Sequence, residues 1–404
     1  MDHSDGTIAD RRIPSMPKAI WGYGFRPFFL GAGTIAALLI PWWAGTLVWG
    51  IPLETSWPPS LWHGHEMLFG FIAAAIAGFL LTAVPSWTGE RGFAGWPLIL
   101  LTTIWGLGRL AVATASLWPL PVVAGLDLLF LPALAALVLP PLLRARNRNT
   151  PLLAVLIALW AANIAFYWGL FRGDAVFARH ALLTGIDIVL LLVTVIGGRI
   201  IPAFTSAALK QRGEQIQVRS DPTMTRLAVA GMLAVLVVDL WRPESRTAGA
   251  VAAAVAVTQA IRLAQWQGLR TLRMPIVWVL HLGYLWLPVG FGLKALALLA
   301  GLAFAAFYLH ALTIGAATTM IVAVMTRASL GHTGRPLLVT RSTAYAYALL
   351  TAAAAVRVFG PGWLALPYTE VVLLAAALWT AAFVLFLMVY APILLSPRLD
   401  GKPG

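Results

Sequence analysis

The sequence is built from apolar runs of about 20 residues that are separated by short polar connections. A helix needs roughly 20 apolar residues to cross the hydrocarbon core of a bilayer, where the backbone must satisfy its own hydrogen bonds. The break at 116–118 and the boundary near Lys294 leave eleven or thirteen runs as alternatives to about twelve. The pattern predicts an all-α, polytopic membrane bundle with spans at 25–50, 61–84, 96–116, 118–141, 151–171, 180–203, 225–241, 247–265, 274–298, 303–326, 340–359 and 367–394.

Composition supports a membrane protein over a soluble one. Of the 404 residues, 60% are hydrophobic and 11% are charged, whereas soluble domains carry roughly 25% charged residues. We expect an N-terminal tail at 1–24, a transmembrane domain at 25–394 and a C-terminal tail at 395–404. Because no apolar core precedes about Phe25, we expect no cleavable signal peptide.

The distribution of Lys and Arg predicts the orientation. With the N-terminus inside, the outer segments hold six basic residues, which are Arg172, Arg179, Arg242, Arg246, Lys294 and Arg357. The inner segments hold eighteen, which are Arg11, Arg12, Lys18, Arg91, Arg144, Arg146, Arg148, Lys210, Arg212, Arg219, Arg262, Arg270, Arg273, Arg327, Arg335, Arg341, Arg398 and Lys402. The positive-inside rule therefore places both termini in the cytoplasm. The net charge of +13 follows this pattern, and without a basic surface interleaved with aromatics we expect no nucleic-acid binding.

The absence of cysteine limits the chemistry that the chain can carry out. It excludes disulfides, thiolate metal sites, iron–sulfur clusters and covalently attached c-type haem. A metal must be held by His, Met, carboxylate or backbone oxygen. The sequence also lacks a phosphate-binding loop and a dinucleotide fingerprint, which argues against a nucleotide-driven pump.

Four of the seven histidines fall at a similar predicted depth near the outer leaflet. His63 and His65 begin the second predicted span, His180 begins the sixth, and His310 lies about two turns inside the tenth. Ionisable groups within a bilayer are costly and commonly functional. We predict a metal or haem site built from some of these four residues. The alternative for each is a hydrogen bond to a neighbouring helix or a place in the interfacial zone.

The spacing of the first two histidines separates their directions. Because each residue of an α-helix turns the chain by about 100°, His63 and His65 are about 200° apart. Either His63 precedes the helix, or the two serve different centres on opposite sides. Glu66 and Met67 are expected on the face of His63. Glu66 could ligate a metal, orient an imidazole or relay protons, and its alternative role is a favourable charge at a helix N-terminus.

Further candidates lie deeper in the predicted bundle. Asp187 follows His180 by two turns on the same face and could relay protons, with Asp127 and Asp239 as weaker candidates.

Candidates near the cytoplasmic side form two groups. His281, with Tyr284 three residues later, is a possible second site or a structural pair. Arg199 and His332, together with Arg327 and Arg335, could bind a cofactor by clamping a carboxylate such as a haem propionate. The alternative is ordinary positive-inside charge.

Five segments carry a resemblance to a known family: GYGFRPFFLGAG at 22–33, WHGHEMLFGF at 62–71, RHALLTG at 179–185, GGRIIPAFT at 197–205 and MTRASLGHTGRP at 325–336. In these segments the chain resembles the NnrS family of haem- and copper-containing bacterial membrane proteins. The resemblance implies a multi-pass protein of the bacterial cytoplasmic membrane, with non-covalent b-type haem and copper. It also implies a link to nitric oxide metabolism, denitrification and resistance to nitrosative stress. The matching positions are His63, His65, Glu66, His180, Arg199 and His332.

Three function classes remain from the sequence. The first is a haem- and copper-binding protein whose partners are membrane lipid and nitric oxide or a related small molecule. The second is a proton-coupled transporter or channel that uses intramembrane His, Glu and Asp. The third is a membrane scaffold or assembly factor that delivers metal to an oxidase.

Overall fold

Among the residues that the structure describes, twelve helical spans are long and apolar enough to cross a membrane, which confirms the predicted fold class. The computed structural model describes residues 19–363 and 365–401, and no strand occurs in these ranges. The helices are α2 (Phe25–Trp49), α3 (Pro59–His65), α4 (Ala73–Thr88), α5 (Trp96–Ala113), α6 (Leu120–Leu128), α7 (Phe130–Arg144), α8 (Leu152–Phe171), α9 (Ala175–Gln211), α10 (Pro222–Trp241), α11 (Arg246–Ala264), α12 (Pro275–Ala300), α13 (Tyr308–His310), α14 (Thr319–Gly331), α15 (Arg341–Phe359) and α16 (Tyr368–Leu395).

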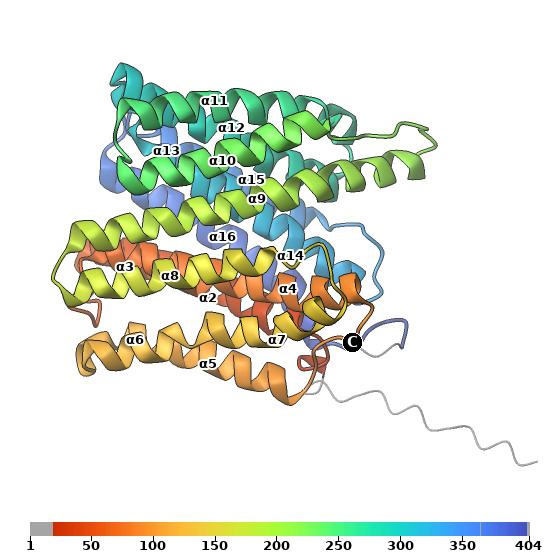
Figure 1. Cartoon of the computed structure of the whole chain (residues 1–404), viewed down its shortest axis with the longest axis horizontal. Coiled ribbons are helices and arrows are strands. Elements are labelled where there is room, and N and C mark those ends of the chain that lie inside the picture. Colours follow the sequence, from red (N-terminus) through yellow and green to blue (C-terminus); the bar gives the residue numbers. More distant parts are fainter. Residues whose placement is uncertain (1–18, 364, 402–404) are drawn as a thin grey trace, which may run out of the picture.

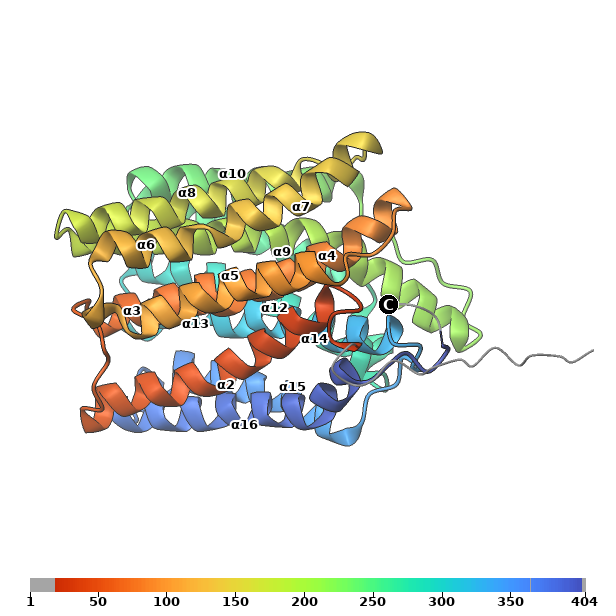
Figure 2. The ribbon, with the colours of Figure 1, turned by 90° about the horizontal axis from the view of Figure 1, so that it is seen from below.

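The helices lie alongside one another, so the bundle has two ends (Figures 1 and 2). The first and last spans pack together. Trp379 of α16 donates a hydrogen bond to the carbonyl of Ala36 in α2 over 2.8 Å, and Arg26 donates to the carbonyl of Leu394 over 2.8 Å. We call the end that carries the C-terminus, at the right in Figure 1, the terminal end, and the opposite end the distal end.

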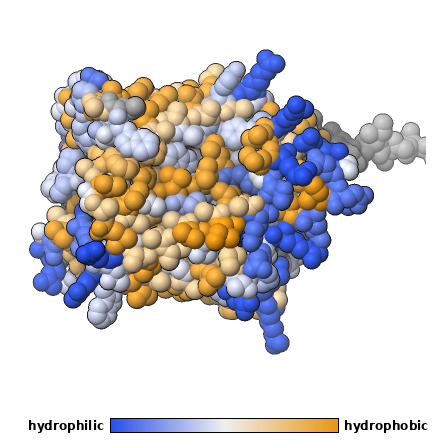
Figure 3. Space-filling model, turned by 90° about the horizontal axis from the view of Figure 1, so that it is seen from above, coloured by the Kyte–Doolittle hydropathy of each residue, from blue (hydrophilic) through white to orange (hydrophobic). Residues whose placement is uncertain are grey.

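The surface between the two ends is strongly apolar. Figure 3 shows a broad hydrophobic region across the middle of the molecule and hydrophilic residues concentrated toward the ends, above all the terminal end. Large apolar side chains point outward from several helices, including Leu38 at 62%, Ile157 at 61% and Met388 at 69% exposure. Water would oppose such exposure, whereas lipid chains accept it. The chain is therefore a multi-pass membrane protein in contact with lipid.

One helix differs clearly from its predicted length. The sixth span, predicted at 180–203, is the 37-residue helix Ala175–Gln211, and at 1.5 Å per residue it is roughly 55 Å long. It projects beyond its neighbours at the terminal end (Figure 1). The added C-terminal turns contain Ala, Leu, Lys and Gln, which favour helix even outside lipid. At the other end, the Asp174 side chain caps the helix by accepting from the Phe177 N–H over 2.9 Å.

Two spans change their hydrogen-bonding pattern immediately after a histidine. The second span is π-helical over Glu66–Ile72, directly after His65. The tenth is π-helical over Ala311–Thr318, directly after His310. Such π-helical segments are rare and frequently occur at functional sites. The apolar runs predict regular helices at both positions, and residues of both π-helical segments line one cavity.

Candidate metal and cofactor site

A cavity of about 320 Å³ lies near the distal end, between the helices that carry His63 and His310. His63 enters its wall from α3, and His310 enters from α13, immediately before the second π-helical segment. The remaining wall is largely apolar and comes from α2, α9, α15, α16 and the two π-helical segments. Small-molecule sites commonly have this character: an apolar cavity with a few polar groups.

Both cavity histidines have imidazoles without a polar partner. No hydrogen bond joins His63 or His310 to another residue within the described ranges. The His63 ring lies nearly parallel to the Trp43 indole, with 4.3 Å between ring centroids and 23° between planes. This contact fixes the plane of the ring without using its nitrogens. Both imidazoles are therefore available to a ligand in the cavity.

A buried cation forms another part of the wall. Arg357 is 5% exposed, and its Nη2 donates to the Tyr368 hydroxyl over 2.9 Å. Its Nη1 and the indole N–H of Trp43 are buried donors without partners in the described structure. Arg179 also contributes to the wall and forms an exposed ion pair with Glu244 at 3.4 Å. Among the described residues that line the cavity, none is acidic. The cavity is therefore suited to a ligand with an apolar body and negatively charged groups.

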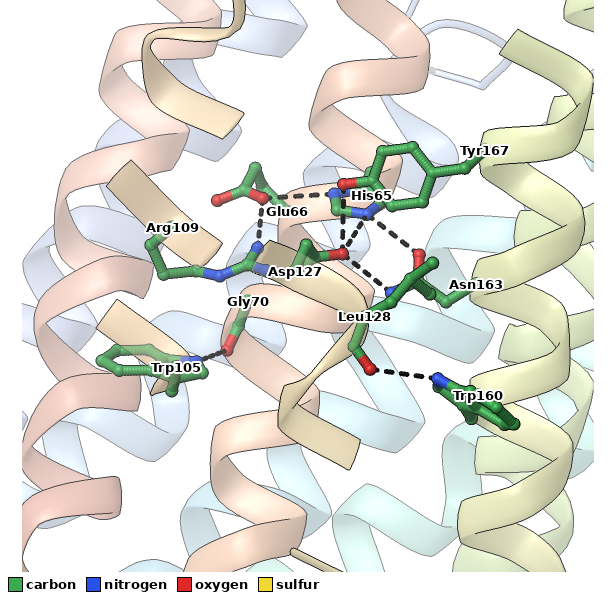
Figure 4. Close-up of polar contacts among 10 residues, drawn as sticks. All are labelled: His65, Glu66, Gly70, Trp105, Arg109, Asp127, Leu128, Trp160, Asn163 and Tyr167. Carbon is green, nitrogen blue, oxygen red and sulfur yellow. Dashed lines mark hydrogen bonds and ion pairs between the residues drawn. The ribbon is translucent and has the colours of Figure 1, made fainter. Parts of the chain in front are cut away.

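His65 lies on the opposite side of span 2 in a buried polar cluster (Figure 4). Its Nδ1 lies 3.2 Å from Glu66 Oε1, and its Nε2 lies 3.1 Å from Asn163 Oδ1 and 3.2 Å from Asp127 Oδ2. The ring is fully buried and stacks on Phe166, with centroids 4.7 Å apart. Because both nitrogens already contact acceptors, neither is directed at an open metal position.

Arg109 connects the carboxylates of this cluster. The guanidinium donates to both Glu66 and Asp127. Asp127 also accepts from Asn163 Nδ2 over 2.8 Å and from the Tyr167 hydroxyl over 3.1 Å. Helices α5, α6 and α8 are thereby joined to the start of span 2. Buried charges are tolerated when they are paired and hydrogen bonded in this way.

The predicted outer histidines are thus divided among different surroundings. His63 and His310 share the cavity, whereas His65 does not reach it. His180 is partly buried near the start of α9 and is not part of the cavity wall. Within the described ranges, no group of three or more His, Asp or Glu side chains is arranged to hold a metal ion. Of the four predicted histidines, the structure therefore brings His63 and His310 together.

Glu66 also differs from its predicted direction. Met67 lines the cavity with His63 as expected, but the Glu66 carboxylate contacts Arg109 on the other side. The π-helical segment begins at Glu66 and changes the rotation per residue. An ordinary helical wheel therefore misplaces this side chain.

The structure brings together two residues of the predicted cytoplasmic clamp, His332 and Arg327, but not Arg199. His332 lines a second cavity of about 240 Å³, together with Arg327, whose guanidinium carbon lies 3.7 Å from the centroid of the Phe204 ring. Arg199 instead donates to Asn149 Oδ1 over 2.6 Å and is not part of that wall. Burial, and then the charge of Arg398, lower the pKa of His332 from its ordinary value of 6.5.

The two residues of the possible second site, His281 and Tyr284, have different hydrogen-bond partners. The Nε2 atom of His281 lies 2.9 Å from the Thr205 hydroxyl oxygen. The Tyr284 hydroxyl accepts from Arg262 over 2.8 Å and donates to Gln259 Oε1 over 2.5 Å. Arg262, predicted in an inner polar segment, is instead buried within α11.

Three cavity or cluster residues were not predicted for these roles. Arg109 was not singled out, Arg357 was assigned to an outer polar segment, and Trp43 was one of 18 tryptophans. A charged residue inside an apolar run was the available signal for both arginines. No signal in the sequence distinguishes Trp43 from the tryptophans at lipid interfaces.

Comparison with known protein families matches residues 19–398 to the family described as NnrS protein. The chain belongs to the NnrS family. Membership of this family suggests a membrane protein related to nitric oxide. No curated protein matches the chain.

Proposed function

We propose that this NnrS-family chain is a haem- and copper-binding protein that acts in nitric oxide metabolism and resistance to nitrosative stress. The observation that carries the proposal is the pair of imidazoles without polar partners, His63 and His310, in one apolar cavity. We further propose that the protein lies in the bacterial cytoplasmic membrane with both termini in the cytoplasm, so that the distal end faces the periplasm.

The wall of the cavity fits haem. Haem is flat and apolar, carries two carboxylates and is commonly held by an axial histidine. His63 and His310 provide the imidazoles, and the unpartnered Nη1 of Arg357 can donate to a carboxylate. When bound, haem would supply an iron position for a small diatomic gas. Trp43 holds the plane of the His63 ring, while the apolar side chains exclude water.

The same wall offers donors that suit copper. Met67 lines the cavity with both histidines; thioether ligands favour Cu(I), and imidazole is a common copper ligand. The proposed copper ligands are therefore His63, His310 and Met67. Haem and copper would draw on the same two imidazoles, so their binding to His63 and His310 is expected to be competitive.

The transporter alternative is less well supported. Proton-coupled transport usually places titratable carboxylates along the substrate path. Here no carboxylate belongs to the described lining of the cavity, and the buried carboxylates Glu66 and Asp127 are paired with Arg109 behind span 2. The apolar wall with two free imidazoles favours a metal or haem ligand.

The proposal is tested by haem and copper analysis of the purified full chain. We expect a Soret band in the natural protein and a loss of at least about tenfold in bound haem or copper for His63→Ala and for His310→Ala. His180→Ala is the matched control, because His180 lies outside the cavity wall, and it should retain both. Full haem and copper content in both cavity variants would show that the site is wrong.

A further inference from the structure

A second set of buried charges lies behind the cavity, where α9, α10 and α12 meet. Lys294 of α12 forms an ion pair with the Oδ2 atom of Asp239 in α10. The carboxyl group of Asp187, from α9, lies next to that of Asp239. Asp187 is 6% and Lys294 is 4% exposed. Two carboxyl groups thus share one ammonium in an apolar interior.

One acceptor of this group is left without a donor. The Oδ1 atom of Asp239 is buried and has no hydrogen-bond donor within the described ranges. Water cannot readily replace that donor, because the Asp239 side chain is only 9% exposed. An ionised carboxylate only accepts hydrogen bonds, so an ionised Asp187 cannot satisfy this oxygen. A proton on Asp187 would make it a donor and would satisfy the buried acceptor.

The charge count leads to the same result. Two ionised carboxylates beside one ammonium would leave a net negative charge where solvent cannot stabilise it. The cluster around Arg109 differs, because Asp127 also accepts hydrogen bonds from Asn163 and Tyr167, whereas Asp239 has no donor besides Lys294 within the described ranges. The other titratable group at the pair is Tyr308, whose ring centroid lies 5.8 Å from Lys294 Nζ. Arg179 and Glu244 are exposed and are paired with each other. A shared proton balances Lys294, Asp187 and Asp239 without another cation.

We propose that Asp187 and Asp239 form a proton-binding site that holds one proton between them at neutral pH. Ile186, the residue before Asp187, lines the cavity, so the proton lies directly behind the cavity wall. The site can give a proton to, or accept one from, a reaction in the cavity. It holds the proton whether or not the cavity is occupied, so the inference goes beyond the haem and copper proposal.

Infrared spectroscopy of the purified full chain tests this site without any cofactor. A protonated carboxyl group has a carbonyl-stretching band that shifts in D2O, and an ordinary Asp, with a pKa of about 3.9, has lost it at neutral pH. We expect the band at neutral pH, a further shift when aspartate is labelled with ¹³C at its side-chain carboxyl, and loss of the band in Asp187→Asn. Asp174→Asn is the matched control, since it alters an exposed aspartate at the start of the same helix and keeps a residue that can cap it.

Two results would overturn the inference. One is the absence of an aspartate carboxylic-acid band in the natural protein at neutral pH. The other is a band that persists in Asp187→Asn. If Asp187→Asn does not fold, Asp239→Asn gives the same test. The Asn amide oxygen can still accept from Lys294, while Asp187 can then ionise against the ammonium, so the band should again disappear.

Discussion

On one side of span 2, His65 is enclosed by hydrogen-bonding side chains, whereas on the other side His63 faces a cavity without a polar partner. The arginines differ in the same way. Arg109 is paired with two carboxylates, while Arg357 contacts a hydroxyl and keeps one donor unpartnered. Polar groups on the His65 side satisfy one another and join helices. Those on the His63 side are left available to a ligand, and this difference separates a structural cluster from a candidate binding site.

The largest expected effect concerns the two arginines. Arg109→Met would leave Glu66 and Asp127 buried without their cation, which typically costs about 3–5 kcal/mol. We expect poor accumulation in the membrane and a much lower melting temperature, measured by size-exclusion chromatography after heating. Arg357→Met removes no ion pair, so it should fold and lose ligand instead.

Restoring charge balance provides the control for this prediction. The triple variant Arg109→Met, Glu66→Gln, Asp127→Asn removes all three charges, and it should recover a large part of the lost stability because no isolated charge remains. Equal stability losses for Arg109→Met and Arg357→Met would remove the distinction between the two sides.

A smaller difference is expected between the histidines themselves. His65→Ala leaves buried acceptors without a partner and should lower stability by about 1–3 kcal/mol. His63→Ala loses mainly its contact with Trp43, for which about 1 kcal/mol is expected. Thermal unfolding of the two variants without added haem or copper measures this difference. A larger loss for His63→Ala would contradict the comparison.

The smallest expected effect is on the pH dependence of the melting temperature, and it concerns His332 at the terminal end. Its lowered pKa means that the folded protein binds a proton less readily than the unfolded chain. Stability contributed by neutral His332 is therefore lost as the pH falls below about 6.5, through the lower folded value. Between about pH 7 and about pH 5, the melting temperature should fall less in His332→Gln than in the natural protein. Parallel curves would show that His332 does not contribute.

The sequence predicted the membrane spans better than the candidate site. Hydropathy shows where a span begins and ends, but it does not show which neighbour a given side chain faces. Hydropathy located Phe25–Trp49 and Leu152–Phe171 to within a residue of the predicted 25–50 and 151–171. The 200° separation correctly placed His63 and His65 on different sides. Rotation about the helix axis, however, depends on packing. It brings His310 but not His180 to the cavity, and it was not predictable from depth alone.

The most direct test of the central claim is chemical rescue of His63. We expect His63→Gly to lose the Soret band that marks histidine-ligated haem, and added imidazole to restore it by entering the vacated position beside Trp43. His65→Gly should show no such recovery, because its imidazole serves the buried cluster. An unchanged Soret band in His63→Gly, or recovery by imidazole only in His65→Gly, would contradict the assignment of His63 to the ligand.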